Sequence, residues 1–307
     1  MSLEMVTARF LLVLGLLLGT GSAWTDASGG SPTPAGFRIG VISERSGAPS
    51  HAIAQYGPML DYLQDALRHT EIAVSELAVA EHLEEMRGWI AAGQIDALFE
   101  SLIPSLKLEI ETARIRPRLL VWRKGQRVYR TLFFTRQDSP IRQLQDLRGR
   151  SLAVESARST SAFFLPKLTL EAWGMHLRPE GSRRSPEDIL YSFAGSELNQ
   201  AYWVERGKAD AGAFNDGDWT RTPRTLRKRL RIFHRTPPLL RYLLSFRTDL
   251  PASIREPVEA ALLAMHKDAA GRGTLTRASR ITRIEPFTDA DRAQLETWRA
   301  RLADRPH

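Results

Sequence analysis

The sequence predicts an α/β protein of two similar lobes joined by two extended crossovers, and two observations support this fold class. Short strand-like runs alternate with segments whose apolar residues recur at helical spacing, which is typical of α/β proteins. The alternation starts twice, near residue 37 and near residue 129, in a chain of 307 residues that is long enough for two domains. Hydrophobic residues make up 43% of the chain and charged residues 25%, which excludes a disordered chain and a polytopic membrane protein.

The first α/β series runs from residue 37 to residue 122. Its predicted strands cover residues 37–42, 72–79, 95–99 and 118–122. Its predicted helices cover residues 81–92 and 104–113, preceded by a helix with apolar residues at helical spacing, namely Met59, Leu60, Leu63 and Leu67. Gly93 follows the helix at 81–92, as expected for a helix C-terminus.

The second series begins with the extended run 129–136 and a short helix that closes on Gly149. Strands are then predicted at 151–155, 189–193 and 209–214, with helices at 159–173 and 196–206. Residues 239–246 are extended again, and helical stretches begin near Ser253 and Asp289. Taking 131–136 and 239–246 as crossovers, we expect one lobe of residues 37–130 plus 247–307 and a second lobe of residues 131–246, which includes the hinge strands.

The first 23 residues have the pattern of a cleavable secretory signal peptide. Arg9 precedes an apolar run at residues 10–18, and small residues lead to a predicted cleavage site after Ala23. A membrane anchor is the alternative, but this run is half the roughly 20 residues that a spanning helix needs. The chain has no cysteine, which excludes disulfides, thiolate metal sites and lipid attachment. We therefore expect a periplasmic protein that is not a lipoprotein, with a flexible lead-in at residues 24–36.

The formal charge of +8 would favour nucleic acid as a partner of a cytoplasmic protein. For an exported protein we expect no nucleic-acid partner, and the basic surplus is better explained by anionic ligands, a membrane surface or solubility. The densest basic run is 221–235 (RTPRTLRKRLRIFHR). We interpret this run as a solvated helix face, with a docking patch for a permease or an anionic membrane as the alternative. We expect the surplus charge on the outer surface rather than in the binding site.

Three consecutive hydroxyl residues are the most informative feature of the sequence. Ser159, Thr160 and Ser161 follow a predicted strand and stand where a helix begins. The first N–H groups of a helix lack internal partners and carry partial positive charge, so they attract anions. One hydroxyl would suffice as a helix N-cap. Three in a row favour binding of an oxyanion over capping alone.

The chain resembles the periplasmic phosphate, phosphite and phosphonate binding proteins of ABC transporters. The resemblance covers about residues 37–270, and its specific part is residues 159–166 (STSAFFLP) after residues 146–150 (DLRGR), with weaker matches at 37–42, 93–97, 193–196, 207–213 and 247–251. It implies a type II periplasmic binding protein fold, a two-lobed Venus flytrap with two hinge crossovers that clamps its ligand between the lobes.

The resemblance also implies ligand contacts. Ser159, Thr160, Ser161 and the amide of Ala162 match the positions that grip the phosphonate, and Tyr129 matches an aromatic residue before the first hinge strand. Glu197 replaces a histidine of the family, and further candidates for ligand binding are Glu44, Glu100, Ser101, Asp216 and Tyr242. An ionised carboxylate only accepts hydrogen bonds and repels a dianion, so Glu197 suits a protonated oxyanion, a neutral acid or a ligand with a cationic tail. Alternatively, the acids face solvent or pair with arginines.

We therefore predict a solute-binding protein that captures a small phosphonate-, phosphite- or phosphate-like oxyanion and delivers it to an ABC permease. A sensor of the same fold that signals to a membrane histidine kinase is an alternative. A third hypothesis is a periplasmic enzyme with Glu197 as base, but no activated nucleophile or Gly-x-Ser-x-Gly elbow is present. The seven histidines show no metal-ligand spacing. We expect a monomer with no enzymatic activity, no metal and no cofactor.

Overall fold

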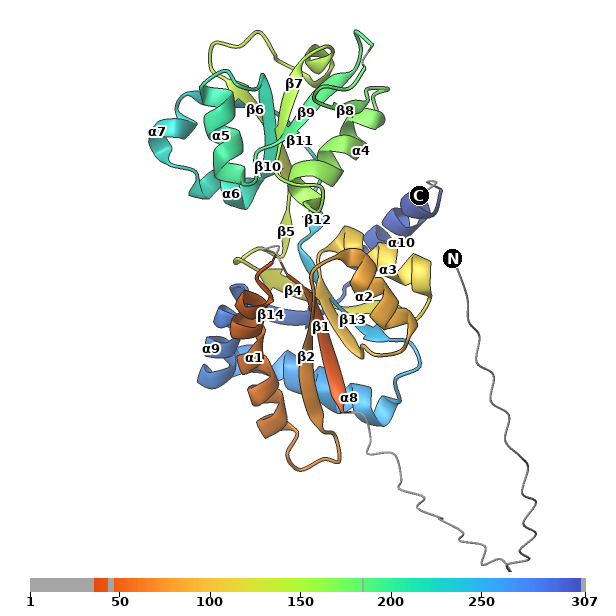
Figure 1. Ribbon diagram of the computed structural model, residues 1–307. Coiled ribbons are helices and arrows are strands. Elements are labelled where there is room, and N and C mark those ends of the chain that lie inside the picture. The colour runs from red at the N-terminus through yellow and green to blue at the C-terminus, as the bar shows by residue number, and fades with distance from the viewer. Residues whose placement is uncertain (1–35, 44–46, 184, 305–307) are drawn as a thin grey trace, which may run out of the picture. The chain divides into compact units, whose positions relative to one another are not determined.

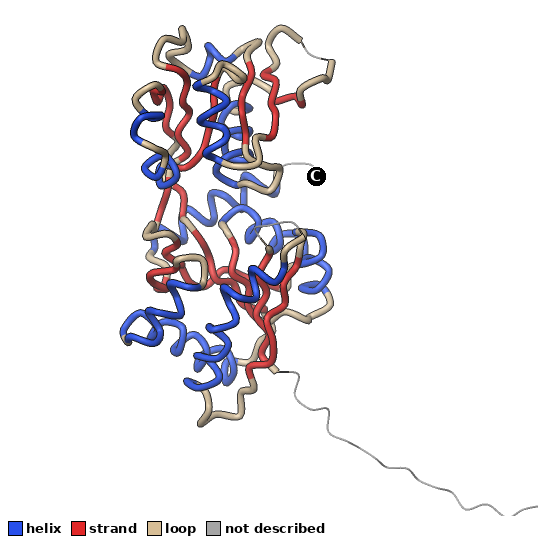
Figure 2. Tube along the Cα trace, turned by 60° about the vertical axis from the view of Figure 1, so that its left-hand side comes forward, coloured by secondary structure: helices blue, strands red, loops and turns tan. Residues whose placement is uncertain are grey.

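The computed structural model describes residues 36–43, 47–183 and 185–304, and it confirms the predicted two-lobed α/β fold (Figure 1). The compact unit Ala35–His307 contains two six-stranded sheets, each with helices on both sides (Figure 2). Among the described residues, no helix has both the length and the apolar character needed to cross a membrane.

The first sheet has the strand order β14-β4-β13-β3-β1-β2. Its strands are β1 (Phe37–Ile42), β2 (Val74–Ala80), β3 (Ala97–Glu100), β4 (Ile115–Arg123), β13 (Tyr242–Arg247) and β14 (Ile281–Pro286). Strand β1 runs parallel to β2 and β3, whereas β13 is antiparallel to both β3 and β4. The carboxyl ends of β1 and β3 therefore meet at one edge of this sheet, where ligands of open α/β sheets bind.

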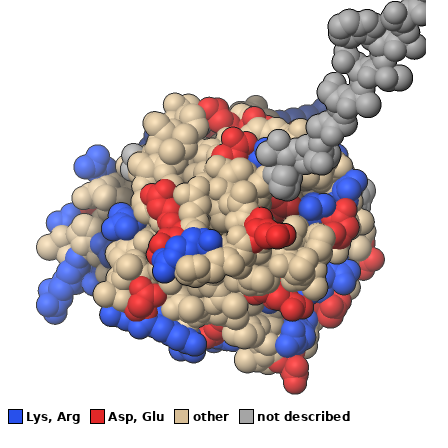
Figure 3. Space-filling view, turned by 90° about the horizontal axis from the view of Figure 1, so that it is seen from below, with Lys and Arg blue, Asp and Glu red and all other residues tan. Residues whose placement is uncertain are grey.

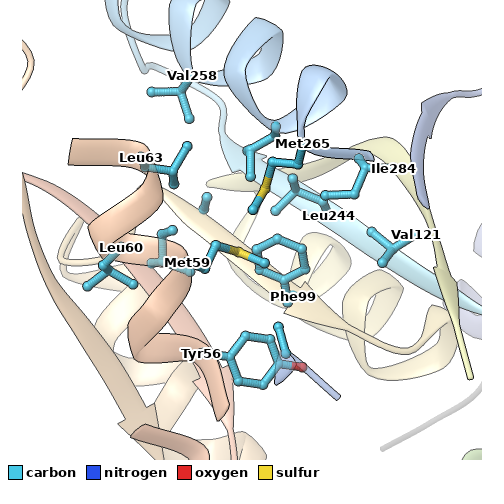
Figure 4. Packing of buried hydrophobic residues seen from close by; sticks show 14 of the residues in the cluster. Tyr56, Met59, Leu60, Leu63, Phe99, Val121, Leu244, Val258, Met265 and Ile284 are labelled. Atoms are coloured by element: carbon cyan, nitrogen blue, oxygen red, sulfur yellow. The ribbon is translucent and has the colours of Figure 1, made fainter. Parts of the chain in front are cut away.

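Helices cover both faces of the first sheet. One face packs against α1 (Pro49–Ala66), α8 (Ala252–Ala264) and α9 (Ala269–Arg277), and the other against α2 (Leu83–Ala91), α3 (Leu102–Thr112) and α10 (Asp289–Ala303). In Figure 4, Met59 and Leu63 of α1 reach toward Phe99 of β3 and Val258 of α8. All four of these side chains are fully buried, so the predicted apolar stripe of this helix is its core face.

The second sheet has the order β11-β6-β10-β7-β9-β8. Its strands are β6 (Thr131–Arg136), β7 (Ser151–Val154), β8 (Leu177–Pro179), β9 (Ile189–Phe193), β10 (Ala211–Asn215) and β11 (Leu230–Arg235). Side chains alternate across the sheet, so Phe133 packs with α4 (Leu165–Glu171) on one face. The next residue, Phe134, packs on the other face with α5 (Glu197–Glu205), α6 (Asp216–Arg221) and α7 (Arg224–Arg227).

Two short strands carry the chain between the sheets. Strand β5 (Val128–Tyr129) leads from β4 to β6, and β12 (Leu239–Leu240) leads from β11 back to β13. These two strands pair with each other antiparallel as a separate two-stranded sheet. The crossovers are therefore shorter than the sequence indicated. Strand β13 belongs to the first sheet, whereas the expected boundary at residue 246 placed most of it in the second lobe.

Several elements differ from the sequence-based expectations. Helix α1 begins at Pro49, ten residues before the first apolar residue used to predict it, and β8, α9 and β14 were not predicted. The segment expected to be a helix over 159–173 consists of a π-helical turn at Thr160–Phe164 followed by α4. The basic run 221–235, interpreted as a helix face, contains the short helix α7 and then strand β11. Pairing with β6 holds β11 extended, and a single sequence does not reveal this partner.

Candidate functional site

A cavity of about 630 Å³ lies at the carboxyl ends of strands from both sheets. Its lining includes residues within two positions of the ends of β1, β3, β7 and β9 and the last residue of β10, namely Ser43, Ser101, Glu155, Gly195 and Asn215. Parallel strands place their carboxyl ends at one edge of a sheet, and this edge is where loops can gather polar groups around a ligand. The two sheets thus contribute to one polar cavity.

The hydroxyls of Ser101, Ser159, Thr160 and Ser161, which we call the hydroxyl wall, line this cavity. Ser159 caps the π-helical turn, because its hydroxyl accepts a hydrogen bond from the Ala162 amide at 3.1 Å. Ser101 Oγ and Thr160 Oγ1 are 3.1 Å apart, and Asn215 donates to Ser161 at 3.3 Å. Both interpretations of the Ser-Thr-Ser segment therefore fit its geometry: one hydroxyl caps a helical turn, and all three face the cavity.

Four carboxyl groups line the same cavity: Glu100, Glu155, Glu197 and Asp218. Burial, followed by the nearby charges of Glu155 and Asp218, raises the pKa of Glu197 to about 7. Burial also raises the pKa of Glu155 and of Glu100, although hydrogen bonds from Ser159 and Ser101, respectively, oppose it.

Asp218 behaves differently from its neighbours. Burial alone would raise the pKa of Asp218, but Lys124, Arg221 and a hydrogen bond from Asn215 hold it below its ordinary value. The ionised charge of Asp218 then favours a proton on Glu197. A protonated carboxyl group donates a hydrogen bond, so Glu197 near neutral pH can act as a donor as well as an acceptor.

Basic side chains from the first-sheet side form a second wall. We call Arg123, Lys124, Arg241, Arg277 and Arg280 the basic wall; a sixth cation, Arg158, reaches the cavity from the second-sheet side. The lining of the candidate site thus includes part of the basic surplus, which the sequence led us to expect on the outer surface. On the face of the molecule in Figure 3, basic and acidic side chains are interspersed.

The basic wall comes from three turns that are far apart in the sequence. Arg123 ends β4 and Lys124 follows it, Arg241 lies between β12 and β13, Arg277 ends α9, and Arg280 directly precedes β14. The guanidinium of Arg123 lies 4.8 Å from the ring centre of Tyr242, and that of Arg241 lies 4.9 Å from the ring centre of Tyr129. These rings support the two cations through cation–π attraction and fix their direction.

The remaining predicted residues fall in different places. Tyr129 lines the cavity, but Ala162 is fully buried behind it, and its amide is engaged by Ser159. Tyr242 lies behind the lining and donates a hydrogen bond to the Phe99 carbonyl at 3.1 Å. Asp216 accepts a hydrogen bond from Gln126 at 2.7 Å and is not one of the lining residues. Glu44 lies outside the described residues.

Sequence reasoning missed most of the charged lining. The cations of the basic wall carry no motif, because they meet only through the pairing of β4 with β13 and β14. Glu155, Arg158 and Asn215 follow or end predicted strands, and this position at the carboxyl end of a strand could have identified them as candidate lining residues. In the described parts of the chain, no group of three or more His, Cys, Asp or Glu residues is arranged to hold a metal ion.

Comparisons with known proteins agree with the fold and identify the family. The family model for the periplasmic substrate-binding protein of phosphonate ABC transporters matches residues 39–292. The protein XAC2383 from Xanthomonas citri, solved with chloride and with ATP, is 29% identical with a TM-score of 0.79. The chloride-bound structure covers 88% of this chain and 99% of its own, and the ATP-bound structure covers 89% and 100%.

PhnD1 from Prochlorococcus marinus, solved with methylphosphonate, has the same fold at 15% identity and a TM-score of 0.64. The match covers 89% of this chain and 100% of that protein. No curated protein matches the chain significantly.

Proposed function

The chain belongs to the family of periplasmic substrate-binding proteins of phosphonate ABC transporters, and from this premise we propose that its cavity captures a small phosphonate-, phosphite- or phosphate-like oxyanion for delivery to an ABC importer. The observation that carries the proposal is the hydroxyl wall, whose Ser159, Thr160 and Ser161 face a cavity that also holds basic side chains. Hydroxyl donors and cations converging on one enclosed space are what an oxyanion requires.

The charge of the lining also supports an anionic ligand. Its six cations outnumber its four carboxyl groups, and burial favours the neutral form of Glu100, Glu155 and Glu197. The cavity therefore has a net positive charge near neutral pH. XAC2383, the 29% identical protein from Xanthomonas citri, was solved with two anions, chloride and ATP, and we extend the preference for anions to this chain.

We propose that ligand binding favours a closed arrangement of the two lobes, with β5 and β12 as the hinge. The ligand would contact the hydroxyl wall and the basic wall together, so it would bind the closed state more tightly and shift the population toward it. The paired crossovers are tied to α10, because Gln294 accepts a hydrogen bond from Leu240 N at 2.9 Å and donates one to Pro238 at 3.1 Å. The permease would recognise the closed state.

We place the lobe boundaries at these crossovers, so that one lobe is built on the first sheet and the other on the second. We further propose that residues 1–23 direct export and that the released protein acts as a monomer in the periplasm. No step of this role requires bond breaking by the protein, so we propose binding without catalysis.

Calorimetric titration of the purified protein tests the proposal. Phosphate, phosphite, methylphosphonate and aminoethylphosphonate form the panel, and ethanesulfonate is the control for a tetrahedral anion without phosphorus. We expect saturable binding of at least one phosphorus oxyanion, together with a raised melting temperature, because a ligand that binds only the folded state stabilises it. A folded protein that binds no member of the panel contradicts the proposed function.

A further inference from the structure

The basic wall brings together charges of one sign. Burial, and then the charges of Arg241 and Arg280 beside it, lower the pKa of Arg123. Burial likewise lowers the pKa of Lys124 to about 8, with Arg123 and Arg241 contributing and Asp218 opposing. These shifts indicate that the four cations lie close enough to repel one another.

Four of the five cations of this wall form no ion pair with any described residue, namely Lys124, Arg241, Arg277 and Arg280. Arg241 is only 7% exposed, and its Nε has no hydrogen-bond partner in the described structure. Elsewhere, even the partly exposed Arg127 is paired, contacting Asp291 at 2.5 Å and Glu285 at 2.8 Å. A buried cation without a partner is costly, so this arrangement indicates a ligand that supplies the missing negative charge.

The backbone turns that carry the basic wall include residues in the left-handed conformation, which is strained for residues other than glycine. Only four described residues other than glycine have positive φ angles, and three of them line the cavity: Lys124 (56°), Ser279 (55°) and Arg280 (57°). The two turns are joined, because Lys124 N donates to the Arg280 carbonyl at 2.8 Å and Arg123 donates to Ser279 Oγ at 3.3 Å. Side chains rarely adopt this left-handed conformation, and such residues concentrate at ligand-binding sites.

We propose that the basic wall is a second anion subsite and that the ligand carries two phosphate-type groups, one on the hydroxyl wall and the other on the basic wall. This inference rests on the proposed function and names its substrate class as diphosphates, either inorganic or as esters. The two walls derive from different elements of one cavity of about 630 Å³, far more than one phosphate occupies. Arginine is the side chain best suited to a phosphate group, because its planar donors bind two oxygens at once.

The test compares pyrophosphate with orthophosphate by calorimetry. In the wild-type protein we expect pyrophosphate to bind at least tenfold more tightly. The double variant Arg277→Gln/Arg280→Gln removes two exposed side chains and should fold, and it should reduce the ratio of the two affinities by about tenfold, as expected for the loss of one or two charge-assisted contacts. The double variant Arg224→Gln/Lys228→Gln removes the same charge from exposed positions outside the lining and should keep the wild-type ratio.

The outcomes separate the two proposals. Equal wild-type affinities for pyrophosphate and orthophosphate, or an unchanged ratio in Arg277→Gln/Arg280→Gln, overturn the second subsite while the oxyanion function stands. An equal fall of the ratio in the Arg224→Gln/Lys228→Gln control also overturns it, because the effect would then reflect net charge alone. If the folded wild-type protein binds neither these anions nor methylphosphonate, the proposed function fails as well.

Discussion

The two walls of the cavity differ in how far their polar and charged groups are paired within the protein. Hydroxyl groups of the hydroxyl wall are already hydrogen-bonded to protein groups: Ser101 donates to Glu100 at 2.7 Å, and Ser159 accepts from Ala162 at 3.1 Å. The basic wall instead holds cations that lack ion-pair partners among the described residues, such as Arg241. The hydroxyls of one wall are therefore paired within the protein, whereas Lys124, Arg241, Arg277 and Arg280 of the other have no ion-pair partner among the described residues. Under the proposed function, the hydroxyl wall would position the oxyanion, whereas the basic wall would gain most from the negative charge that the ligand brings.

The largest expected effect comes from the hydroxyl wall. Ser159→Ala/Ser161→Ala should weaken oxyanion binding by roughly 2–3 kcal/mol, because each lost bond to a charged ligand costs about 1–1.5 kcal/mol. Calorimetry measures the affinity. Thr169→Ala is a matched control, since it removes a hydroxyl of α4 that bonds the Leu165 carbonyl at 2.7 Å and lies outside the lining. Unchanged affinity in the double variant would show that the ligand does not contact this wall.

Glu197 links proton binding to stability. Its pKa of about 7 lies above its ordinary value of 4.5, so the native state holds a proton that the unfolded state has already released over this interval. The stability that Glu197 contributes is therefore complete below about pH 4.5 and is lost as the pH rises through 7. Glu197→Gln cannot ionise and should exceed the wild-type stability by about 1–2 kcal/mol at pH 8, allowing for partial solvent screening.

Denaturant unfolding at pH 5 and pH 8 measures this effect. The gain of Glu197→Gln over the wild type should vanish toward pH 5. Glu205→Gln, at the other end of α5 and outside the lining, is the control and should show no gain at pH 8. A Glu197→Gln variant that is less stable than the wild type at pH 8 would contradict a neutral carboxyl in the native state.

Arg241 tests whether the basic wall is costly without a ligand. Arg241→Met should raise the free energy of unfolding of the ligand-free protein by about 1 kcal/mol, because it replaces a buried cation that forms no ion pair with any described residue by an apolar side chain of similar length. The same variant should bind anions more weakly. Arg247→Met is the contrasting control: Arg247 contacts Asp96 at 2.9 Å, so its loss should destabilise the protein. A clear loss of stability in Arg241→Met would show that this cation is satisfied inside the protein.

The smallest effect is expected from the outer basic run. Arg224→Gln/Lys228→Gln should change the affinity for orthophosphate by less than about twofold at 0.15 M salt, where the Debye length is only about 8 Å. A fall comparable to that of Arg241→Met would mean that the charge of the run 221–235 contributes to capture. The distinction between the cations of the basic wall and those of the run 221–235 would then not explain where the anion binds.

The hydroxyl wall was predictable and the basic wall was not, for a physical reason. Residues 159–161 are adjacent in the chain, and a helix start imposes its own hydrogen-bonding pattern, so their chemistry is visible in the sequence. Arg123, Arg241 and Arg280 come together only when β13 and β14 pair with β4, and long-range pairing leaves no local signal.

The strand series was predicted for a related reason. Buried strands such as β1 and β7 have apolar runs that can be recognised in the sequence without knowledge of their partner strands. Strand β11 reads as a basic segment, because most of its side chains are only partly buried, and its extended form depends on β6. The crossovers β5 and β12 are two residues each and are defined by their pairing with each other.

A crystal structure of the protein with pyrophosphate is the most direct test of the account. We expect one phosphate group within hydrogen-bond distance of the hydroxyls of Ser159 and Ser161, and the other within that distance of the guanidinium groups of Arg277 or Arg280. Pyrophosphate bound with both groups on one wall, or outside the cavity, would contradict a ligand held between the two walls.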